Sequence, residues 1–289
     1  MTISIALVTC TDIPDLEPDD RLLIEPLQAR GADVMVAVWD DPNVDWNSFD
    51  LVVLRSPWDY TPRRDQFVAW ANSVKNLVNA AGIVEWNTDK RYLAELQAAG
   101  ARVVPTTWVS PDQPNWDMPA DGEWVIKPTV SAGSRDTGRY DLSSPEHRTH
   151  AAAHLKRLLT SGRVAMIQPY LDAVDTYGET ALIFFGGAFS HAIRKGPMLE
   201  GPDLGVDGLY KAEAIVPRTP TEAELDAARA VLAAVPDSLP AALYARVDVI
   251  PGPDGLPTLV ELELTEPSLF LEHSDGAPGR LADALIALL

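Results

Sequence analysis

The sequence has little cysteine and no long hydrophobic run, and both shortages limit where the protein is expected to work. A single cysteine, Cys10, among 289 residues excludes a disulfide framework and fits a reducing cytoplasm best. The apolar run at residues 3–8 is too short to span a membrane and follows no basic segment, so neither a signal peptide nor an anchor is expected. These features predict a cytoplasmic protein without a membrane partner.

Positive charge is also scarce, because 23 Lys and Arg residues face 42 Asp and Glu residues and leave a net charge of -19 at pH 7. Such an excess of negative charge repels phosphate backbones and argues against a nucleic acid partner. The length and the 46% hydrophobic content suffice for two or three packed subdomains. We therefore expect small-molecule partners, and the sequence leaves the oligomeric state open, a homo-oligomer included.

The N-terminal part of the chain alternates between strand and helix patterns. Strands are expected near residues 3–9, 33–38 and 51–55, and helices at 19–30 and 63–80. This order predicts a parallel sheet with helices on its faces. Ligands bind such sheets at the carboxyl ends of their strands, so the loop after the third strand is a candidate binding segment.

That loop reads RSPWDY, from Arg55 to Tyr60, and it offers a cation, an acid and two aromatic rings. Arg55, Asp59 and Tyr60 are therefore candidate substrate contacts. The alternative interpretation is a surface turn set by Pro57, because proline fixes its own backbone angle and often begins a turn. Composition alone does not decide between a binding loop and a turn.

Two lysines lie where an anionic ligand would explain them. Lys127 shares one face of an expected strand, residues 123–129, with Val125, and a lysine among apolar neighbours needs an anion or contact with water. Lys90 falls in the first turn of an expected helix, residues 86–100, where a cation opposes the helix dipole. A bound anion would offset that cost, but an exposed lysine is equally compatible with the pattern.

A loop of small residues follows the strand that carries Lys127. It reads SAGSRDTGRY, residues 131–140, and its backbone N–H groups could fold over phosphates. It is not a Walker A motif, because G-x-x-x-x-G-K-[ST] is absent from the sequence. Most loops of this composition are only hairpin turns, so the two lysines are needed to favour a phosphate site. A second glycine-rich segment, residues 196–208, is a further candidate lid.

Three helices are expected in the rest of the chain. They cover residues 145–160, residues 221–234, where Thr221 and Glu224 fit a capping box, and residues 279–289, where Leu281, Leu285 and Ile286 form the buried stripe.

The clearest chemical signal is a pair of acidic strands near the C-terminus. Glu261 and Glu263 alternate with apolar residues and therefore share one face of a strand. Arg246 and Asp248 share a face of the preceding strand in the same way. Between the strands lies the hairpin signal Asp254-Gly255. A tight turn there places Asp248 opposite Glu261, and it places Arg246 opposite Glu263.

Opposed carboxylates are destabilising unless a cation joins them or one of them is protonated. Oxygen-only ligands are typical of Mg²⁺ and also suit Mn²⁺, and Mg²⁺ usually combines one or two carboxylates with substrate phosphates. This face is therefore predicted to be a metal platform for a nucleotide. The alternatives are a carboxylate pair of the glycosidase type and a solvated acidic face.

From about Val53 to the last residue, the order of these motifs resembles that of the ATP-grasp ligases, in the branch of glutathione synthetase. The resemblance implies an α/β fold in which a parallel N-terminal subdomain, residues 1–84, precedes two α+β subdomains. These subdomains, residues 85–168 and 169–289, would clasp the nucleotide between them. The resemblance also implies ATP and Mg²⁺ as cofactors and a small carboxylate as substrate.

The resemblance assigns roles to individual residues. The family's nucleotide-binding positions are matched by Lys90, Lys127, Ser131, Gly133, Gln168, Tyr170, Leu171 and Glu179. Its metal-binding positions are matched by Asp248, Glu261 and Glu263, the last of which is usually Asn in the family. The groups implied to stabilise the moving phosphoryl charge are Lys127, Arg194 and Arg246. Arg246 is expected either to pair with Glu263 or to hold the acyl phosphate.

Three stretches, RSPWDY, IKP…SAG and ELELTEPSLF, further resemble the cyclo-ligases of cycloserine biosynthesis. The resemblance implies that ATP phosphorylates a carboxylate, that a nitrogen attacks the acyl phosphate, and that ADP and phosphate are released. In a cyclo-ligase that nitrogen belongs to the substrate itself, and O-ureido-serine closes to the antibiotic cycloserine. The alternatives are an amino-acid or peptide ligase of the same fold, a nucleotide-binding protein without turnover, and a carboxylate-pair hydrolase.

Overall fold

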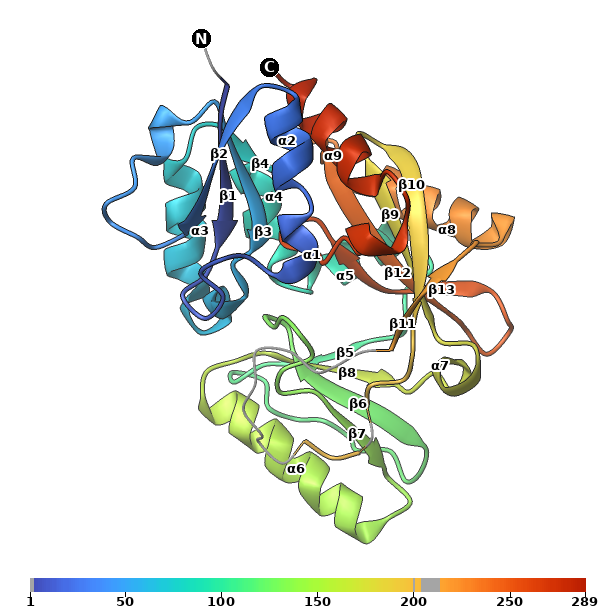
Figure 1. Ribbon diagram of the computed structural model, residues 1–289. Helices are drawn as coiled ribbons and strands as arrows, with labels where there is room; N and C mark the ends of the chain where they lie inside the picture. Colours follow the sequence, from blue (N-terminus) through green and yellow to red (C-terminus); the bar gives the residue numbers. More distant parts are fainter. Residues whose placement is uncertain (1–2, 200, 204–213) are drawn as a thin grey trace.

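The computed structural model describes residues 3–199, 201–203 and 214–289, and three β-sheets organise these residues (Figure 1). The N-terminal sheet is parallel, as its alternating sequence predicted, with the strand order β2-β1-β3-β4. Its strands are β1 (Ile3–Thr9), β2 (Ala32–Val38), β3 (Leu51–Ser56) and β4 (Leu77–Val78).

The helices around this sheet are shorter than the expected ones. The expected helix at residues 19–30 is divided into α1 (Pro18–Arg21) and α2 (Ile24–Ala29). The expected helix at residues 63–80 ends early, because α3 covers Arg64–Ser73 and the chain then pairs with β3 as β4. Strand pairing in a buried core prevails there over local helix propensity.

The helix expected to carry Lys90 is also divided. Residues 81–98 form α4 (Ala81–Asn87) and α5 (Tyr92–Ala98), and Lys90 lies in the turn between them. The helix-dipole argument for Lys90 is therefore wrong. Instead, the backbone N–H of Lys90 donates to the carbonyl oxygen of Thr129 at 2.8 Å, which fixes the turn beside the strand that carries Lys127.

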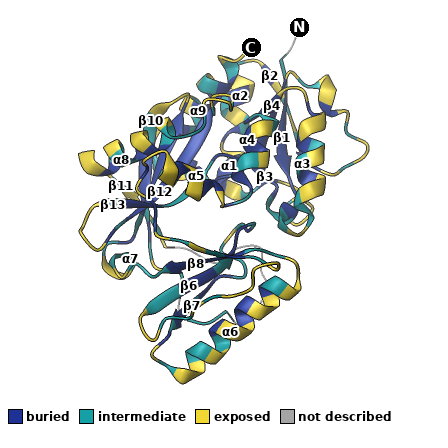
Figure 2. Cartoon of the chain, turned by 180° about the vertical axis from the view of Figure 1, so that it is seen from behind, coloured by how far each residue is buried: buried dark blue, intermediate teal, exposed yellow. Residues whose placement is uncertain are grey.

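A four-stranded antiparallel sheet and one long helix form a separate lobe (Figure 1). The helix, α6 (Pro145–Thr160), has the predicted bounds, and Figure 2 shows that its outer face is exposed. Neither α6 nor any other helix among the described residues is long and apolar enough to cross a membrane. In the order β5-β8-β6-β7, the strands are Thr107–Val109, Ala165–Pro169, Glu123–Pro128 and Gly138–Asp141. We call this part the α6 lobe.

The third sheet is antiparallel and has five strands in the order β11-β10-β9-β12-β13. The helix α8 (Glu222–Ala233) packs on it and begins with the predicted capping box of Thr221 and Glu224. The short α7 (Ala173–Thr176) precedes β9. The strands are β9 (Glu179–Phe185), β10 (Ala188–Lys195), β11 (Ile215–Arg218), β12 (Tyr244–Pro251) and β13 (Pro257–Glu263).

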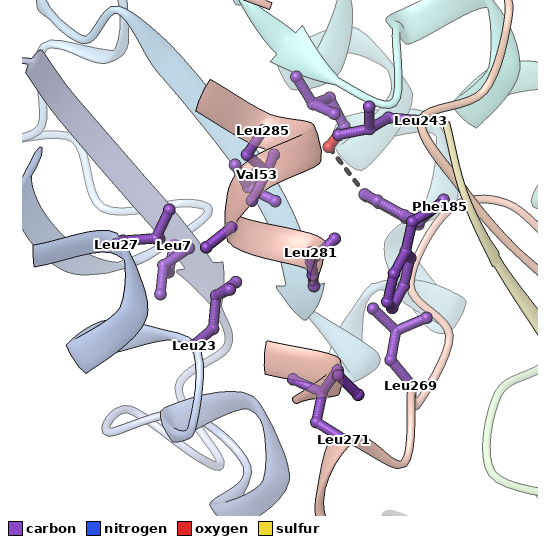
Figure 3. Close-up of a cluster of buried hydrophobic side chains, with 14 of the residues drawn as sticks. Leu7, Leu23, Leu27, Val53, Phe185, Leu243, Leu269, Leu271, Leu281 and Leu285 are labelled. Atoms are coloured by element: carbon purple, nitrogen blue, oxygen red, sulfur yellow. Dashed lines mark hydrogen bonds between the residues drawn. The ribbon is translucent and has the colours of Figure 1, made fainter. Parts of the chain in front are cut away.

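The helix α9 (Ala277–Ile286) joins the parallel sheet to the five-stranded sheet (Figure 3). Leu281 and Leu285 of α9 are fully buried, as the amphipathic pattern predicted. They belong to one cluster with Leu7 and Val53 of the parallel sheet and Phe185 of β9. The first and third sheets therefore share a hydrophobic core, whereas the α6 lobe has a core of its own.

Candidate active site

A cavity of about 420 Å³ lies where the α6 lobe meets the other two sheets. Its wall combines the loop after β3, strands β6 and β8 of the α6 lobe, and strands β12 and β13. The predicted site residues that line it are Tyr60, Lys90, Lys127, Ser131, Gly133, Gln168, Tyr170, Leu171, Glu179, Arg246, Glu261 and Glu263. The other four predicted residues, Arg55, Asp59, Arg194 and Asp248, are not part of its lining.

The β12–β13 hairpin has the expected register at its acids. Asp248 pairs with Glu261, and Arg246 pairs with Glu263. Both pairs lie on adjacent strands of a well-packed sheet, so the four charged groups are forced into a small volume. The acidic face that the sequence predicted is therefore present, and a solvated surface does not describe it, because Asp248 is 1% exposed and Arg246 6% exposed.

The turn of this hairpin differs from the expected two-residue turn. A longer loop is closed by a hydrogen bond from the backbone N–H of Gly252 to the carbonyl oxygen of Leu256, at 2.8 Å. Val260 then stands out of register as a β-bulge. The bulge compensates for the longer loop, and for that reason the acids still oppose each other as the shorter turn predicted.

Arg246 is at the centre of the charge cluster. Its guanidinium donates to both carboxylate oxygens of Asp248, over 2.9 to 3.1 Å, and to Oε1 of Glu263 at 2.5 Å. Its Nη1 donates to the carbonyl oxygen of Ser268 at 3.2 Å. Of its two expected roles, the pairing with Glu263 is thus present in the structure.

The acids of this cluster differ in their affinity for protons. Burial raises the pKa of Glu263 to about 8, because the charges of Glu261 and Asp248 reinforce burial and together outweigh Arg246. Burial would also raise the pKa of Asp248, but Arg246 and Lys195 lower it to about 2. Near neutral pH Asp248 is therefore ionised, whereas Glu263 is largely protonated and adds little negative charge to the cluster. In the opposed pair of Asp248 and Glu261, cations offset the repulsion, because Lys195 contacts Asp248 and Lys90 contacts Glu261.

Lys90 ties the loop at residues 131–138 to β13. Its Nζ donates to the carbonyl oxygen of Ser131 at 2.7 Å and to Oγ of the same residue at 3.2 Å. It also forms an ion pair with Oε1 of Glu261 at 3.0 Å. Burial lowers the pKa of Lys90, but the adjacent Glu261 carboxylate raises it more, so the ammonium keeps its charge at the cavity wall.

The positive charge of Lys127 is compensated less by neighbouring groups than the charge of Lys90. It faces the cavity from β6 together with Val125, as strand alternation predicted. No hydrogen bond or ion pair involves its ammonium group within the described parts of the chain. Burial lowers the pKa of Lys127; Lys90 adds to this shift, and Glu261 opposes it. A partly buried ammonium in this state favours an anionic ligand.

A third lysine, Lys195, lines the cavity and was not predicted as a site residue. It forms ion pairs with Glu179 and with Oδ2 of Asp248, the latter at 2.8 Å. Burial raises the pKa of Glu179 to about 7 even though Lys195 lowers it. Lys195 therefore links the acid expected at the nucleotide ribose to the acid cluster of the hairpin.

A β-bulge explains why Lys195 takes the place expected for Arg194. An uninterrupted hairpin around the Gly186-Gly187 turn would put Arg194 opposite Glu179. Ser190 stands out of register, however, and Lys195 pairs with Glu179 instead. A shift of one residue sends a strand side chain to the other face. Accordingly, the guanidinium of Arg194 turns away from the cavity and donates to the carbonyl oxygens of Thr176 and Tyr177.

The residues expected to hold the nucleotide base lie at the end of β8. Nε2 of Gln168 donates to Oγ1 of Thr106 at 2.9 Å. The guanidinium carbon of Arg139 lies over the ring of Tyr170, 3.6 Å from the ring centroid. Leu171 contributes an apolar side chain to the cavity wall. A few fixed polar groups on an apolar surface are the usual environment of a planar ligand in a protein pocket.

Of the three candidate contacts in RSPWDY, Tyr60 alone lines the cavity. Its ring is buried and stacks on Phe67 with centroids 4.6 Å apart. Asp59 points elsewhere, since it accepts a hydrogen bond from Nε1 of Trp39 at 2.7 Å and pairs with Arg63 at 2.9 Å. The structure therefore gives Asp59 a role in holding the loop.

Arg55 is fully buried and reaches across the molecule. Its Nε donates to Oδ1 of Asp20 in α1 at 2.9 Å, and its Nη2 donates to the carbonyl oxygen of Pro267 at 2.6 Å. Arg55 thus fixes the segment that follows β13. That segment contributes cavity-lining residues to which sequence reasoning assigned no role: Glu266, Ser268, Phe270, Glu272 and His273.

Comparisons with known proteins decide the family. Residues 5–81 match the model of the N-terminal domain of the D-cycloserine synthetase DcsG. The chain is 38% identical over 299 residues to the cycloserine biosynthesis protein DcsG of Streptomyces lavendulae, with 97% of each chain covered. The crystal structure of D-cycloserine synthetase DcsG superposes with a TM-score of 0.85 at 36% identity, covering 99% of each chain. The chain belongs to the DcsG family of ATP-grasp ligases.

More distant structures share the ATP-grasp fold of the DcsG family. The ATP-grasp ligase PsnB in complex with a precursor, Mg and ADP has a TM-score of 0.63 at 19% identity, and 99% of each chain is covered. The D-alanine–D-alanine ligase of Bacillus anthracis has a TM-score of 0.64 at 15% identity, over 99% of this chain and 96% of that one. The predicted α/β ATP-grasp fold and the ligase class are thereby confirmed.

Magnesium accompanies ADP in the PsnB complex, and a Mg²⁺ site in the DcsG-family chain would need oxygen donors at the cavity. Within residues 3–199, 201–203 and 214–289, no three His, Cys, Asp or Glu side chains are placed to hold a metal ion by themselves. Lysine and arginine groups contact the predicted ligands instead. The oxygen-only donors and the raised pKa of Glu263 still fit a Mg²⁺ that arrives with phosphates, since Mg²⁺ usually takes only one or two protein carboxylates.

Proposed function

We propose that this ATP-grasp ligase uses ATP to activate the carboxylate of O-ureido-serine and closes the ring of cycloserine. The match to the D-cycloserine synthetase DcsG over nearly the whole chain supports the substrate class and the D configuration. The observation that carries the proposal is the partly buried Lys127, whose ammonium faces a cavity that also holds Lys90 and an acid cluster. Such a site is built for a polyanion and a divalent cation together.

The lysines of the cavity would hold the phosphates. Lys127 and Lys90 face the same space from β6 and from the turn after α4, and Lys195 faces it from β10. Phosphoryl transfer depends on positive groups that neutralise the negative charge of the transferred phosphoryl group and on alignment of the reacting oxygens. Covalent help from the protein matters less. Three cations from three elements meet that need. We assign to Lys195 the place that the resemblance gave to Arg194, which turns away from the cavity.

The acid cluster would hold Mg²⁺, and Mn²⁺ has the same ligand preference. Glu261 and Glu263 would provide its protein oxygens, with Asp248 behind them. When bound, the ion would neutralise charge on the transferred phosphoryl group. Arg246 already neutralises the cluster in its absence, and it is placed to keep the carboxylates aligned.

The remaining assignments follow the cavity wall. Gln168, Tyr170 and Leu171 would receive the adenine, and Glu179 would meet the ribose. Ser131 and Gly133 would cover the phosphates with the glycine-rich loop. The second candidate lid, residues 196–208, lies partly outside the described residues, since residues 200 and 204–208 are not described. Tyr60, the residue of the three candidate substrate contacts that lines the cavity, is the one that the geometry favours.

The test is a product assay with purified protein, ATP and Mg²⁺. With O-ureido-D-serine we expect ADP, phosphate and cycloserine in equal amounts, and with its L enantiomer much less of each. Amino acids and dipeptides serve as competing substrates. If a mixture of two amino acids gave ADP, phosphate and a dipeptide in equal amounts, and O-ureido-serine gave no product, the protein would be an intermolecular ligase. Binding of Mg·ATP without phosphate release for any carboxylate would favour a protein without turnover.

We propose a cytoplasmic location, which suits the single buried thiol of Cys10.

A further inference from the structure

Glu266 lines the cavity, and nucleotide binding does not account for it. It lies three residues after the end of β13. Its carboxylate is hydrogen-bonded with Tyr60 on one side, while Lys90 and Glu261 act on it electrostatically from the phosphate side. Glu266 is therefore placed where an activated carboxyl group, bound between the lysines and the RSPWDY loop, would react.

The backbone around Glu266 is fixed with unusual completeness. Three consecutive carbonyl oxygens, those of residues 266–268, each accept a hydrogen bond from a side chain of another element. Such support holds a side chain more precisely than a loop alone does. The donors are Nε1 of Trp58, at 3.0 Å, and the guanidinium groups of Arg55 and Arg246, at 2.6 and 3.2 Å.

The charges that face Glu266 come from several elements. Burial raises the pKa of Glu266 to about 7, with the Tyr60 hydroxyl and Lys90 opposing the shift and Glu261 adding to it. Arg246 of β12 also lowers it, and the carboxyl group of Glu263 faces it from β13. Near neutral pH the carboxylate form is therefore available, and it remains basic enough to accept a proton.

We propose that Glu266 is the proton acceptor of the ring-closing step. The nitrogen bonded to oxygen in the substrate attacks the acyl-phosphate carbon, and its lone pair forms the new N–C bond. The C–O bond to phosphate breaks, and its electron pair leaves with the phosphate. The proton of the attacking nitrogen passes to a carboxylate oxygen of Glu266. The ring formed in this step still carries the carbamoyl group of the ureido unit on that nitrogen. Water then cleaves the N–C bond to this group, which leaves as CO2 and ammonia, and the nitrogen keeps a proton to give cycloserine. This inference rests on the proposed function, because it concerns the second half of that reaction.

Other carboxylates of the cavity are less suited to this role. Most of them already hold a cation or a backbone group, whereas the hydrogen-bond partner of Glu266 among the described residues is the neutral hydroxyl of Tyr60. The occupied acids are Glu179 with Lys195, Glu261 with Lys90, Glu263 with Arg246, and Glu17 and Asp19, whose carboxylates accept backbone N–H groups. Glu272 is different, because its side chain is 65% exposed and is not held in the cavity.

The experiment separates activation from ring closure in Glu266→Gln. Added hydroxylamine captures an acyl phosphate as a hydroxamate and does not use the substrate's own nitrogen. We expect the variant to form the hydroxamate at a rate within about threefold of wild type, while single-turnover ring closure falls about 10²- to 10⁴-fold. The matched control is Glu222→Gln on the exposed face of α8, for which neither rate should change. Circular dichroism and thermal unfolding report whether each variant is folded.

Other outcomes are decisive as well. Unchanged ring closure in Glu266→Gln overturns the inference, and so does an equal loss of hydroxamate and ring closure in a folded variant. If Glu266→Gln does not fold, Glu266→Asp replaces it: the pH midpoint of ring closure, expected near pH 7 in wild type, should move, and an identical midpoint overturns the inference. A wild-type protein that makes neither cycloserine nor hydroxamate from O-ureido-serine refutes the proposed function instead.

Discussion

Three lysines face the cavity, and they differ in what compensates their charge. Lys90 and Lys195 each contact carboxylates, Glu261 in one case and Glu179 with Asp248 in the other. For Lys127 the described residues provide no such partner, and burial lowers its pKa. A charge left in this state is costly to the folded protein and is useful only when an anion arrives. Lys127 is therefore the residue that most directly indicates a phosphate ligand.

Replacing Lys127 should separate stability from binding. In Lys127→Met we expect the ligand-free protein to unfold with an unchanged or slightly larger free energy, because a partly buried ammonium without an anionic partner among the described residues is gone. Wild type should gain about 2.7 kcal/mol when Mg·ADP is present at 100 times its Kd, and the variant should gain almost nothing at that concentration. Thermal unfolding measures both effects. Lys75→Met, at an exposed site, is the control and should behave as wild type; a full Mg·ADP shift in Lys127→Met would contradict the assignment.

The carboxyl groups of the cavity give stability a dependence on pH. Burial raises the pKa of Glu263 to about 8, well above its ordinary value. The folded state therefore binds the Glu263 proton more tightly than the unfolded state does. Between the ordinary glutamate pKa and about pH 8, this group lowers the free energy of unfolding as pH rises, by up to about 1.4 kcal/mol per pH unit.

Glu263→Gln should remove that contribution. We expect the unfolding free energy of wild type to fall relative to the variant between pH 5 and pH 8, and the two curves to run parallel at more acidic pH. Urea titrations at a series of pH values measure the difference. A difference that does not change with pH, or one of the opposite sign, is incompatible with a proton held by Glu263 in the folded protein.

At the scale of strands, two β-bulges decide which side chains reach the cavity. In the β12–β13 hairpin the bulge at Val260 cancels the effect of a longer loop, so the predicted opposition of Asp248 and Glu261 is correct. In the β9–β10 hairpin the bulge at Ser190 has no such compensation, and Lys195 replaces Arg194. Alternation and turn signals predict faces reliably only while the register is unbroken. Neither sequence contains a local signal that fixes its bulge.

For helices, too, local sequence patterns predict the structure only where tertiary contacts do not override them. The bounds of α6 and the capping box of α8 follow from local patterns, and both are correct. Local patterns failed where tertiary contacts decide: β4 interrupts an expected helix because it pairs with β3, and Lys90 lies in a turn bound to Thr129. Arg55 is similar, since no local signal tells that its partners are Asp20 and Pro267.

The link between β3 and the segment after β13 is expected to be strong. Arg55→Met should destabilise the protein by about 3–5 kcal/mol, because it leaves the carboxylate of Asp20 buried without its partner. Adding Asp20→Asn should recover a large part of that loss. Urea unfolding of the two single variants and the double variant forms the cycle. If the double variant loses as much stability as the two single variants together, the ion pair with Asp20 does not explain why Arg55 is buried.

On the scale of the whole molecule, the cavity lies between parts with separate cores. The parallel and five-stranded sheets share one core through α9, and the α6 lobe packs around its own (Figures 1 and 3). The parts contribute different side chains to the cavity: Lys127 and Gln168 come from the α6 lobe, and the acids come from the five-stranded sheet. The division at residues 1–84, 85–168 and 169–289 stays a prediction.

Isotope transfer measures most directly whether this arrangement activates a carboxylate. Wild-type protein is incubated with ATP, Mg²⁺ and O-ureido-D-serine whose carboxylate carries ¹⁸O, and the released phosphate is examined by mass spectrometry. An acyl-phosphate intermediate leaves one carboxylate oxygen on phosphorus, so the phosphate should carry a single ¹⁸O atom per turnover. Cycloserine formed together with unlabelled phosphate would contradict the mechanism.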